Sequence, residues 1–224
     1  MSAIRVLYQT IEFNDFDIHL CSLRDKQQFS DPFKEAEALG ISDAQWSLFG
    51  VVWDSSQVLA ERMQTFDIKG KRILEVGCGI ALSSHLLNAR CADITATDYH
   101  PEAGRFLTKN SVLNNEKEIP FLRTDWKTVN SGMGKFDVII GSDLLYEQNH
   151  IELLSEFIQQ HANQQCEVIL VDPGRGNHAK FSKKMIEHGF SHQQSKIDKT
   201  ENSVDRTPNF KGVILSYERK MPMQ

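Results

Sequence analysis

A short apolar run that breaks into a glycine turn is the feature that most constrains this chain. The run occupies residues 73–76 and leads directly into Gly77-Cys78-Gly79. Consecutive apolar residues suit a strand covered on both faces, and glycines without a Cβ let the backbone approach a ligand closely. The helix expected after the turn has unpaired N–H groups at its start. The pattern therefore indicates a strand–turn–helix unit that binds a nucleotide cofactor.

A carboxylate follows the glycines by about 20 residues, one strand–helix–strand unit later. It belongs to Asp98, which closes the apolar-rich run 92–97. At that place a carboxylate accepts hydrogen bonds from ribose hydroxyls. A dinucleotide fingerprint requires Gly or Ala at position 82, where Leu82 stands. Its side chain would obstruct the close contact between helix and strand, which counts against NAD.

From residue 71 onward, predicted strands and helices alternate. Strands are expected near 72–76, 93–97, 120–123, 136–141 and 166–171, and helices over 81–90, 101–114, 149–161 and 178–188. Such alternation demands a doubly wound, Rossmann-like, mostly parallel sheet. A segment near 191–198, a polar loop through Pro208 and a final strand over 212–217 follow without a helix between them. Two consecutive strands without a crossover pair antiparallel, so we expect an antiparallel last strand.

The first 70 residues have a different character. Alternating residues 4–13 and 18–23 flank Asn14-Asp15 and predict an N-terminal β-hairpin. A short helix is expected over 31–39 with Pro32 at its first position, then a capping box over 42–45 and a helix whose N-cap is Asp54 or Ser55. We therefore expect one domain over 1–224, with a hairpin (1–30), lead-in helices (31–70) and a Rossmann-like core (71–220).

Composition excludes several classes of function. The 224 residues are 40% hydrophobic and 25% charged with a net charge of −5, so no general attraction to phosphate backbones is expected. The sequence contains neither a run long enough to cross a membrane nor a secretory apolar core, which favours a cytoplasmic location. The four scattered cysteines indicate buried thiols without a disulfide framework or a metal site, and the histidines over 150–192 are expected to be solvated.

A second polar cluster follows the fourth core strand. Residues 136–141 run into Ser142-Asp143-Leu144-Leu145-Tyr146. In open parallel sheets, ligands bind at the carboxyl ends of the strands. Asp143 and Tyr146 are therefore expected at the mouth of the crevice that the glycine turn and Asp98 assign to the cofactor.

Together these motifs resemble known methyltransferases. The E-x-G-x-G pattern that begins at Glu75 resembles motif I of the class I S-adenosylmethionine-dependent methyltransferases, with Ala81 in place of the third glycine. The larger set, over residues from about 1 to 190, resembles the family 16 protein lysine methyltransferases. Its members are Gly50-x-x-Trp53-Asp54, E-x-G-x-G, Asp98, Asn110, Asn114, Asp125-Trp126 and the D-x-x-Y of Asp143 to Tyr146.

This resemblance implies site residues. Asp143 and Tyr146 would lie at the methyl-acceptor site, and Asp143 would orient an amine. The cofactor site would comprise Trp53, Glu75, Gly77, Gly79, Asp98, Tyr99, Asp125, Trp126 and Ser142. Aromatic faces suit adenine and a sulfonium, and Tyr99 is placed to supply one of them. Two alternatives stay open: Tyr99 as a half-exposed residue at a strand end, and Trp126 as core packing.

The function implied is S-adenosylmethionine-dependent methylation of a protein lysine, which requires no metal. A small-molecule N- or O-methyltransferase and a catalytically silent cofactor-binding module remain as alternatives. Nucleic acid is not expected as the acceptor, because the D/N-P-P-Y/F motif is absent after the fourth strand. Asp172-Pro173-Gly174-Arg175 resembles the branch that methylates the β-subunit of electron transfer flavoprotein. Arg175 would contact an acidic partner surface or close its loop with Glu147.

Overall fold

A computed structural model describes residues 4–127, 132–197, 207 and 210–220, and the predicted loop at Pro208 lies outside them. The strands are β1 (Val6–Glu12), β2 (Asp17–Leu23), β3 (Arg72–Val76), β4 (Asp93–Asp98), β5 (Phe121–Arg123), β6 (Phe136–Ser142), β7 (Ala162–Asp172), β8 (Ser191–Lys196) and β9 (Val213–Arg219). The helices are α1 (Glu35–Ala38), α2 (Asp43–Trp46), the 3-10 helix η1 (Ser47–Gly50), α3 (Asp54–Met63), α4 (Leu82–Ala89), α5 (Ala103–Leu113), α6 (Asn149–His161) and α7 (His178–Glu187). Within the described ranges, no helix combines the length and the apolar character needed to cross a membrane.

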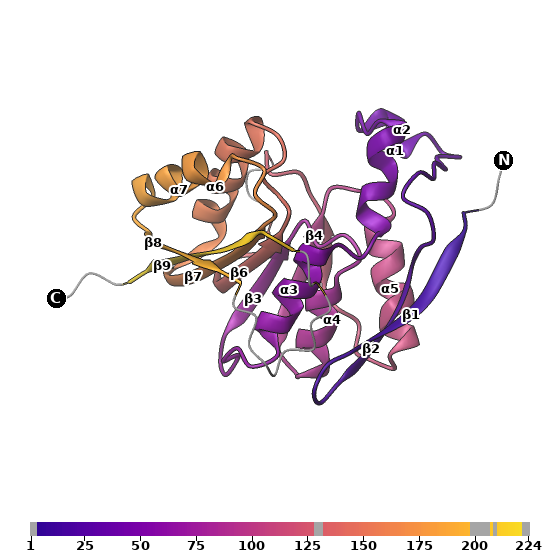
Figure 1. Cartoon of the computed structure of the whole chain (residues 1–224), viewed down its shortest axis with the longest axis horizontal. Coiled ribbons are helices and arrows are strands. Elements are labelled where there is room, and N and C mark those ends of the chain that lie inside the picture. Colours follow the sequence, from indigo (N-terminus) through magenta and orange to yellow (C-terminus); the bar gives the residue numbers. More distant parts are fainter. Residues whose placement is uncertain (1–3, 128–131, 198–206, 208–209, 221–224) are drawn as a thin grey trace.

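Seven strands form one sheet in the order β5-β4-β3-β6-β7-β9-β8, and β1 and β2 form a separate antiparallel hairpin (Figure 1). The strands from β3 to β7 pair in parallel, whereas β9 lies antiparallel between β7 and β8. The predicted fold class is confirmed. The order reverses beside β3, and a crevice at such a switch point is where doubly wound sheets bind ligands.

Alternation along the central strands divides the core into two layers. Val138 and Ile140 of β6 belong to the buried cluster that includes residues of α3, α4, α5 and the hairpin. Ile139 of the same strand points to the opposite face, where its cluster includes residues of α6 and α7. Successive side chains of a strand point to opposite faces, so an unbroken apolar run is what a sheet covered on both sides requires. Figure 1 shows α6 and α7 on one side of the sheet and α3 and α4 on the other.

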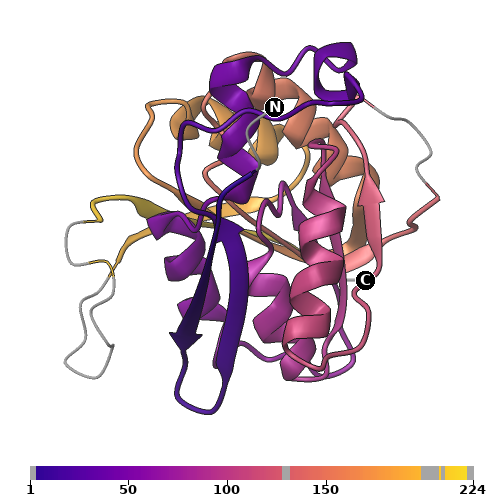
Figure 2. The same cartoon turned by 90° about the vertical axis from the view of Figure 1, so that its right-hand side faces the viewer.

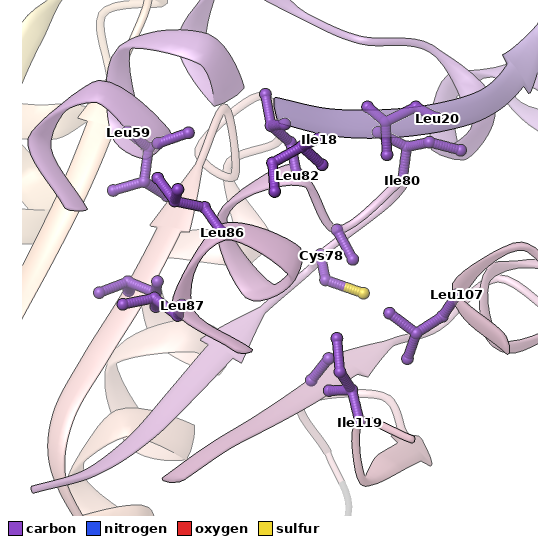
Figure 3. Packing of buried hydrophobic residues seen from close by; sticks show 14 of the residues in the cluster. Ile18, Leu20, Leu59, Cys78, Ile80, Leu82, Leu86, Leu87, Leu107 and Ile119 are labelled. Atoms are coloured by element: carbon purple, nitrogen blue, oxygen red, sulfur yellow. The ribbon is translucent and has the colours of Figure 1, made fainter. Parts of the chain in front are cut away.

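The hairpin covers the glycine turn. Ile18 and Leu20 of β2 pack close to Leu82 and Ile80, at the beginning of α4 (Figure 3). These four side chains are almost fully buried. Strand β2 also contacts α5, and Figure 2 shows the hairpin alongside that helix. The N-terminal segment is therefore part of the wall behind the turn that we expect to hold a cofactor.

Several local expectations are corrected by the structure. The helix predicted over 31–39 is shorter in the structure and consists of α1 alone, because Lys34 adopts a left-handed conformation with φ of 56°. The Asp31 carboxylate instead accepts a hydrogen bond from the Glu37 N–H across a turn. Helix α3 begins at Asp54 with Trp53 as its N-cap, and the capping box over 42–45 is present. Cys91 is exposed in the turn after α4, whereas the other three cysteines are buried as expected.

Candidate active site

One cavity of about 570 Å³ opens at the carboxyl ends of β3, β4 and β6. Ten of the eleven residues predicted for the site line it. They are Trp53, Gly77, Gly79, Asp98, Tyr99, Asp125, Trp126, Ser142, Asp143 and Tyr146. A cavity of this size suits a small ligand or cofactor. The residues that the sequence assigned to the cofactor and to the acceptor therefore meet in one continuous space.

The glycine turn has the conformation that its sequence predicted. Gly77 and Gly79 have φ angles of 59° and 53°, in the left-handed region that side chains disfavour. A Cβ at Gly79 would lie 2.9 Å from the carbonyl oxygen of Phe49, and one at Gly77 would lie 2.5 Å from Cδ2 of Leu144. Close packing against backbone therefore requires glycine at position 79 in addition to its φ, whereas at position 77 φ is the main constraint, because the Leu144 side chain can move.

Glu75 lies behind the turn and does not line the cavity. It is only 3% exposed, and its Oε2 accepts hydrogen bonds from the backbone N–H (3.0 Å) and the hydroxyl of Ser84. Because side chains alternate along β3, Glu75 points to the face that α4 covers rather than to the strand end. Burial raises the pKa of Glu75 to about 7. The structure therefore places Glu75 in support of the first turns of α4 and not at the predicted cofactor contact.

Asp98 joins β4 to the glycine turn. Its Oδ2 accepts a hydrogen bond of 2.7 Å from the Gly79 N–H, and its Oδ1 accepts one of 2.8 Å from the His100 N–H. Burial raises the pKa of Asp98. A carboxylate has about four acceptor sites. Two are used by the backbone, so the fixed carboxylate retains capacity to accept hydroxyl groups of a ligand in the cavity.

Aromatic side chains line the same cavity. The Tyr99 hydroxyl donates a hydrogen bond of 2.6 Å to the carbonyl of Leu39, which tethers the ring although the residue is 38% exposed. The Trp53 indole N–H donates to the carbonyl of Leu48 at 2.9 Å. Both rings are therefore positioned by backbone contacts at the cavity wall. Trp126 lies beside Asp125 on that wall and is partly buried. It therefore lines the cavity and also packs against the core.

Asp143, which lines the same cavity, forms an ion pair that the sequence did not reveal. Arg175 Nε lies 2.6 Å from Asp143 Oδ1, and a terminal guanidinium nitrogen lies 2.7 Å from Oδ2. Of the two alternatives for Arg175, closure of its loop with Glu147 is not what the structure shows, because the guanidinium pairs with Asp143. Asp143 has a φ of 54°, uncommon for a residue other than glycine. Left-handed backbone of this kind often occurs at functional sites.

Tyr146 and His150 stand next to this ion pair. Their ring centroids are 4.6 Å apart, and His150 also packs edge-on against Trp126 at 5.0 Å. Its Nδ1 lies 2.8 Å from the carbonyl of Leu144, and its side chain is only 14% exposed. Burial and nearby carboxylates raise the pKa of Tyr146 to about 12, so its phenol keeps its proton at neutral pH.

The expectation of solvated histidines is wrong at two positions. His150 lies in the first turn of α6 against the cavity, and His161 at the end of that helix is 3% exposed. His100 is a further cavity residue that no sequence motif indicated: it is buried, stacks on Phe49 with ring centroids 4.0 Å apart, and lines the cavity. None of the residues that the structure describes forms a hydrogen bond with its Nε2, and burial lowers the pKa of His100 to about 4. The only sequence signal for His100 was its place two residues after Asp98.

The chain is similar to known methyltransferases in sequence and in fold. Residues 34–188 match the model of a family described as lysine methyltransferase. The electron transfer flavoprotein beta subunit lysine methyltransferase of Mus musculus is 28% identical over 162 residues, which are 70% of this chain and 60% of that protein. A histidine protein methyltransferase 1 homolog of Dictyostelium discoideum is 33% identical over 110 residues, 46% of this chain and 36% of that protein. The alignment thus spans only part of each relative.

Solved structures agree on the fold. A T. thermophilus 16S rRNA methyltransferase, determined in complex with AdoMet and guanosine, superposes with a TM-score of 0.65 at 14% identity. The superposition covers 98% of this chain and 52% of that one. At this identity the likeness establishes the architecture and leaves the acceptor open.

Proposed function

The chain belongs to the lysine methyltransferase family, and we propose that it transfers a methyl group from S-adenosylmethionine to a lysine side chain of a protein substrate. The observation that carries this proposal is that one cavity is lined by Asp98 and the glycine turn and also by Asp143 and Tyr146. We call the part of the cavity around Asp143 and Tyr146 the acceptor end. A methyl donor and an acceptor amine must occupy one continuous space for in-line displacement.

The cavity suits this cofactor in shape and chemistry. Asp98 offers carboxylate oxygens for ribose hydroxyls, while Tyr99 and Trp126 offer rings for adenine and for a positive charge. The unpartnered Nε2 of His100 adds a buried donor: its Nδ1 accepts from the Glu102 N–H, so the proton is on Nε2. S-adenosylmethionine supplies an activated methyl group on a sulfonium. The chain supplies the position of that group relative to the acceptor.

The acceptor end suits an amine on a flexible side chain. The carboxylate of Asp143 can accept a hydrogen bond from an amine N–H, and the neutral phenol of Tyr146 can donate or accept beside it. A partly desolvated site lowers the cost of losing a proton from an ammonium group. These groups orient the amine and exclude water, while the displacement itself needs no acid catalyst for a sulfur leaving group.

Relatives narrow the choice of protein substrate. Two of them are named electron transfer flavoprotein beta subunit lysine methyltransferases, which makes that subunit the first acceptor to test. A histidine ring is the alternative acceptor, because another relative is named a histidine protein methyltransferase. Both acceptors are nitrogen nucleophiles of a protein, and the same cavity would position either one.

Incubation with tritiated cofactor separates these choices. The enzyme is mixed with purified electron transfer flavoprotein β subunit, or with dialysed lysate protein from cells that lack this chain. We expect label in one or few protein bands, insensitive to nuclease, and recovered as methyl-lysine after acid hydrolysis. If the label were recovered as methylhistidine, the acceptor residue would be histidine and not lysine. Label confined to small molecules or to nuclease-sensitive material would overturn the protein substrate, and binding of cofactor without any transfer would indicate a silent module.

A further inference from the structure

The ion pair between Asp143 and Arg175 is the strongest contact to which the proposed methyl transfer assigns no role. Two parallel hydrogen bonds of 2.6 and 2.7 Å join the guanidinium to the two carboxylate oxygens. The Asp143 side chain is 14% exposed, against 47% for Arg175. Bidentate pairs of this kind are short and directional, and an arginine keeps its charge at every accessible pH.

The backbone holds this pair in place from two neighbouring strands. The Asp143 N–H donates a hydrogen bond of 2.9 Å to the carbonyl of Val171, the residue before Asp172 at the end of β7. The buried carboxylate of Asp172 in turn accepts from the N–H groups of Gly174 (2.7 Å) and Arg175 (3.3 Å). These hydrogen bonds hold the Asp-Pro-Gly-Arg segment in a turn that directs Arg175 toward Asp143.

The pair solves a difficulty in the proposed reaction. A lysine amine attacks only as the neutral base, whereas an uncompensated carboxylate beside it would stabilise the ammonium form. A carboxylate has about four acceptor sites, and the two guanidinium N–H groups of Arg175 occupy two of them. Asp143 thus keeps free lone pairs for an amine N–H while its charge is balanced by Arg175.

Resting on the methyl transfer proposed above, we propose that Arg175 is a positioning residue that stays paired with Asp143 during the reaction and cancels its charge. Asp143 then holds the acceptor amine by a hydrogen bond without favouring its ammonium form. The chemical step remains simple. The ammonium first gives its proton to water, the nitrogen lone pair then forms the bond to the methyl carbon, and the carbon–sulfur bond breaks with its electron pair left on sulfur.

Other charged groups around the acceptor end do not replace this role. Besides the pair itself, the charged groups nearest to Tyr146 and Arg175 are Asp98, Glu147 and Asp172. His150 packs against Tyr146, His178 lies near Asp172, and Asp125 and Lys127 lie elsewhere on the cavity lining. Because the three nearest groups are carboxylates, removal of Arg175 leaves the acceptor end more negative. Hydrogen bonding to Asp143 raises the pKa of Arg175, in line with a pair that persists.

The test is the pH dependence of methyl transfer by Arg175→Met and Arg175→Lys. Initial rates of tritium incorporation into dialysed lysate protein are measured from pH 6.5 to 9.5 at saturating S-adenosylmethionine. Arg105→Met is the matched control, because Arg105 pairs with Glu102 on the exposed side of α5. For Arg175→Met, we expect the midpoint of the rising limb to move up by about one pH unit or more. Arg175→Lys, which keeps a charge without the two guanidinium N–H groups, should move it less, and Arg105→Met should not move it.

Cofactor affinity and melting temperature are measured on the same variants, and neither should change for Arg175→Met. An equal loss of rate at every pH would assign Arg175 a structural role and overturn the inference. A gain of rate at every pH would also overturn it, since it would mean that the acceptor has to displace Arg175. If the wild type labels lysine but the Arg175→Met profile is unmoved, only this inference fails. If the wild type binds cofactor and labels no protein lysine, the proposed function fails and the inference with it.

Discussion

The side-chain amide of Asn110 pairs with the backbone of Cys21 as a neighbouring strand would. Its Oδ1 accepts from the Cys21 N–H at 2.7 Å, and its Nδ2 donates to the Cys21 carbonyl at 3.3 Å. Asn114, one turn later on α5, makes the same two bonds to His19, at 2.8 and 2.7 Å. The helix thus satisfies the second edge of β2, which β1 leaves open, and fastens the hairpin to the core.

We expect Asn110→Ala to lower the free energy of unfolding by about 2–3 kcal/mol, because it leaves a buried N–H and a buried carbonyl of Cys21 without partners. Urea denaturation followed by circular dichroism measures this loss. Asn114→Ala is the control, since water can reach the half-exposed edge at His19, and its loss should stay below about 1 kcal/mol. Equal losses for the two variants would contradict the assignment of Asn110 as the buried anchor.

Asp98→Ala should weaken S-adenosylmethionine binding by about 1.5–3 kcal/mol, the range for a lost hydrogen bond to a charged group. The physical reason is twofold: ribose hydroxyls lose their acceptor, and the Gly79 N–H loses the carboxylate that fixes the turn. Isothermal titration calorimetry measures the change, which corresponds to roughly 10- to 100-fold in Kd. Asp93→Ala, at the opposite end of β4, removes an exposed carboxylate and should leave Kd unchanged. An unaltered Kd in folded Asp98→Ala would remove Asp98 from the cofactor site.

The sheet was predictable because its residues repeat a simple physical pattern. Apolar runs such as 73–76 and 136–141 can be buried only between two layers of helices, and the spacing between them fixes a parallel sheet. The one exception was the first part of β7, where Asn163 and two glutamines carry no apolar signal although the strand starts at Ala162. There only Ala162 pairs with β6, at Phe136 and beyond a register shift, and the pairing with β9 begins at Cys166.

The site was predictable only to the level of strand ends. Residues directly after β3, β4 and β6 share one edge of the sheet whatever their side chains do, so Asp98 and Asp143 were found from topology alone. Glu75 does not line the cavity, because it lies one residue inside the strand end, where alternation directs it to α4. The contacts of Arg175 with Asp143 and of His150 with Tyr146 could not be predicted, because they depend on the path of two loops, which no periodicity encodes.

Asp143→Asn should reduce methyl transfer to the background rate while cofactor affinity changes little. The carboxylate of Asp143 pairs with Arg175, whereas the glycine turn is held by Asp98. Tritium transfer and calorimetry on the same preparation measure the two effects separately. Glu152→Gln serves as the control, since Glu152 pairs with Lys184 on the exposed side of α6. Parallel loss of transfer and of cofactor affinity would instead give Asp143 a role in the cofactor pocket or in folding.

Glu75 makes stability depend on pH in a direction opposite to that of an ordinary paired carboxylate. Burial raises its pKa from 4.5 to about 7, so between these values the folded state binds more protons than the unfolded state. Its contribution is therefore fully present below pH 4.5 and is lost as the pH rises through about 7. At 1.36 kcal/mol per pKa unit, the loss amounts to at most about 3 kcal/mol.

Glu75→Gln keeps the shape of the side chain and an acceptor for the Ser84 N–H but cannot titrate. We expect the difference in unfolding free energy between the wild type and Glu75→Gln to move in favour of the variant from pH 5 to pH 8, as measured by urea denaturation of the cofactor-free protein. Glu156→Gln, a substitution on the exposed face of α6, should give a difference that does not vary with pH. A constant difference for Glu75→Gln as well would mean that Glu75 stays ionised when buried. The hydrogen bonds from Ser84 would then outweigh desolvation, and the first turns of α4 would be held by a charge rather than by a neutral acid.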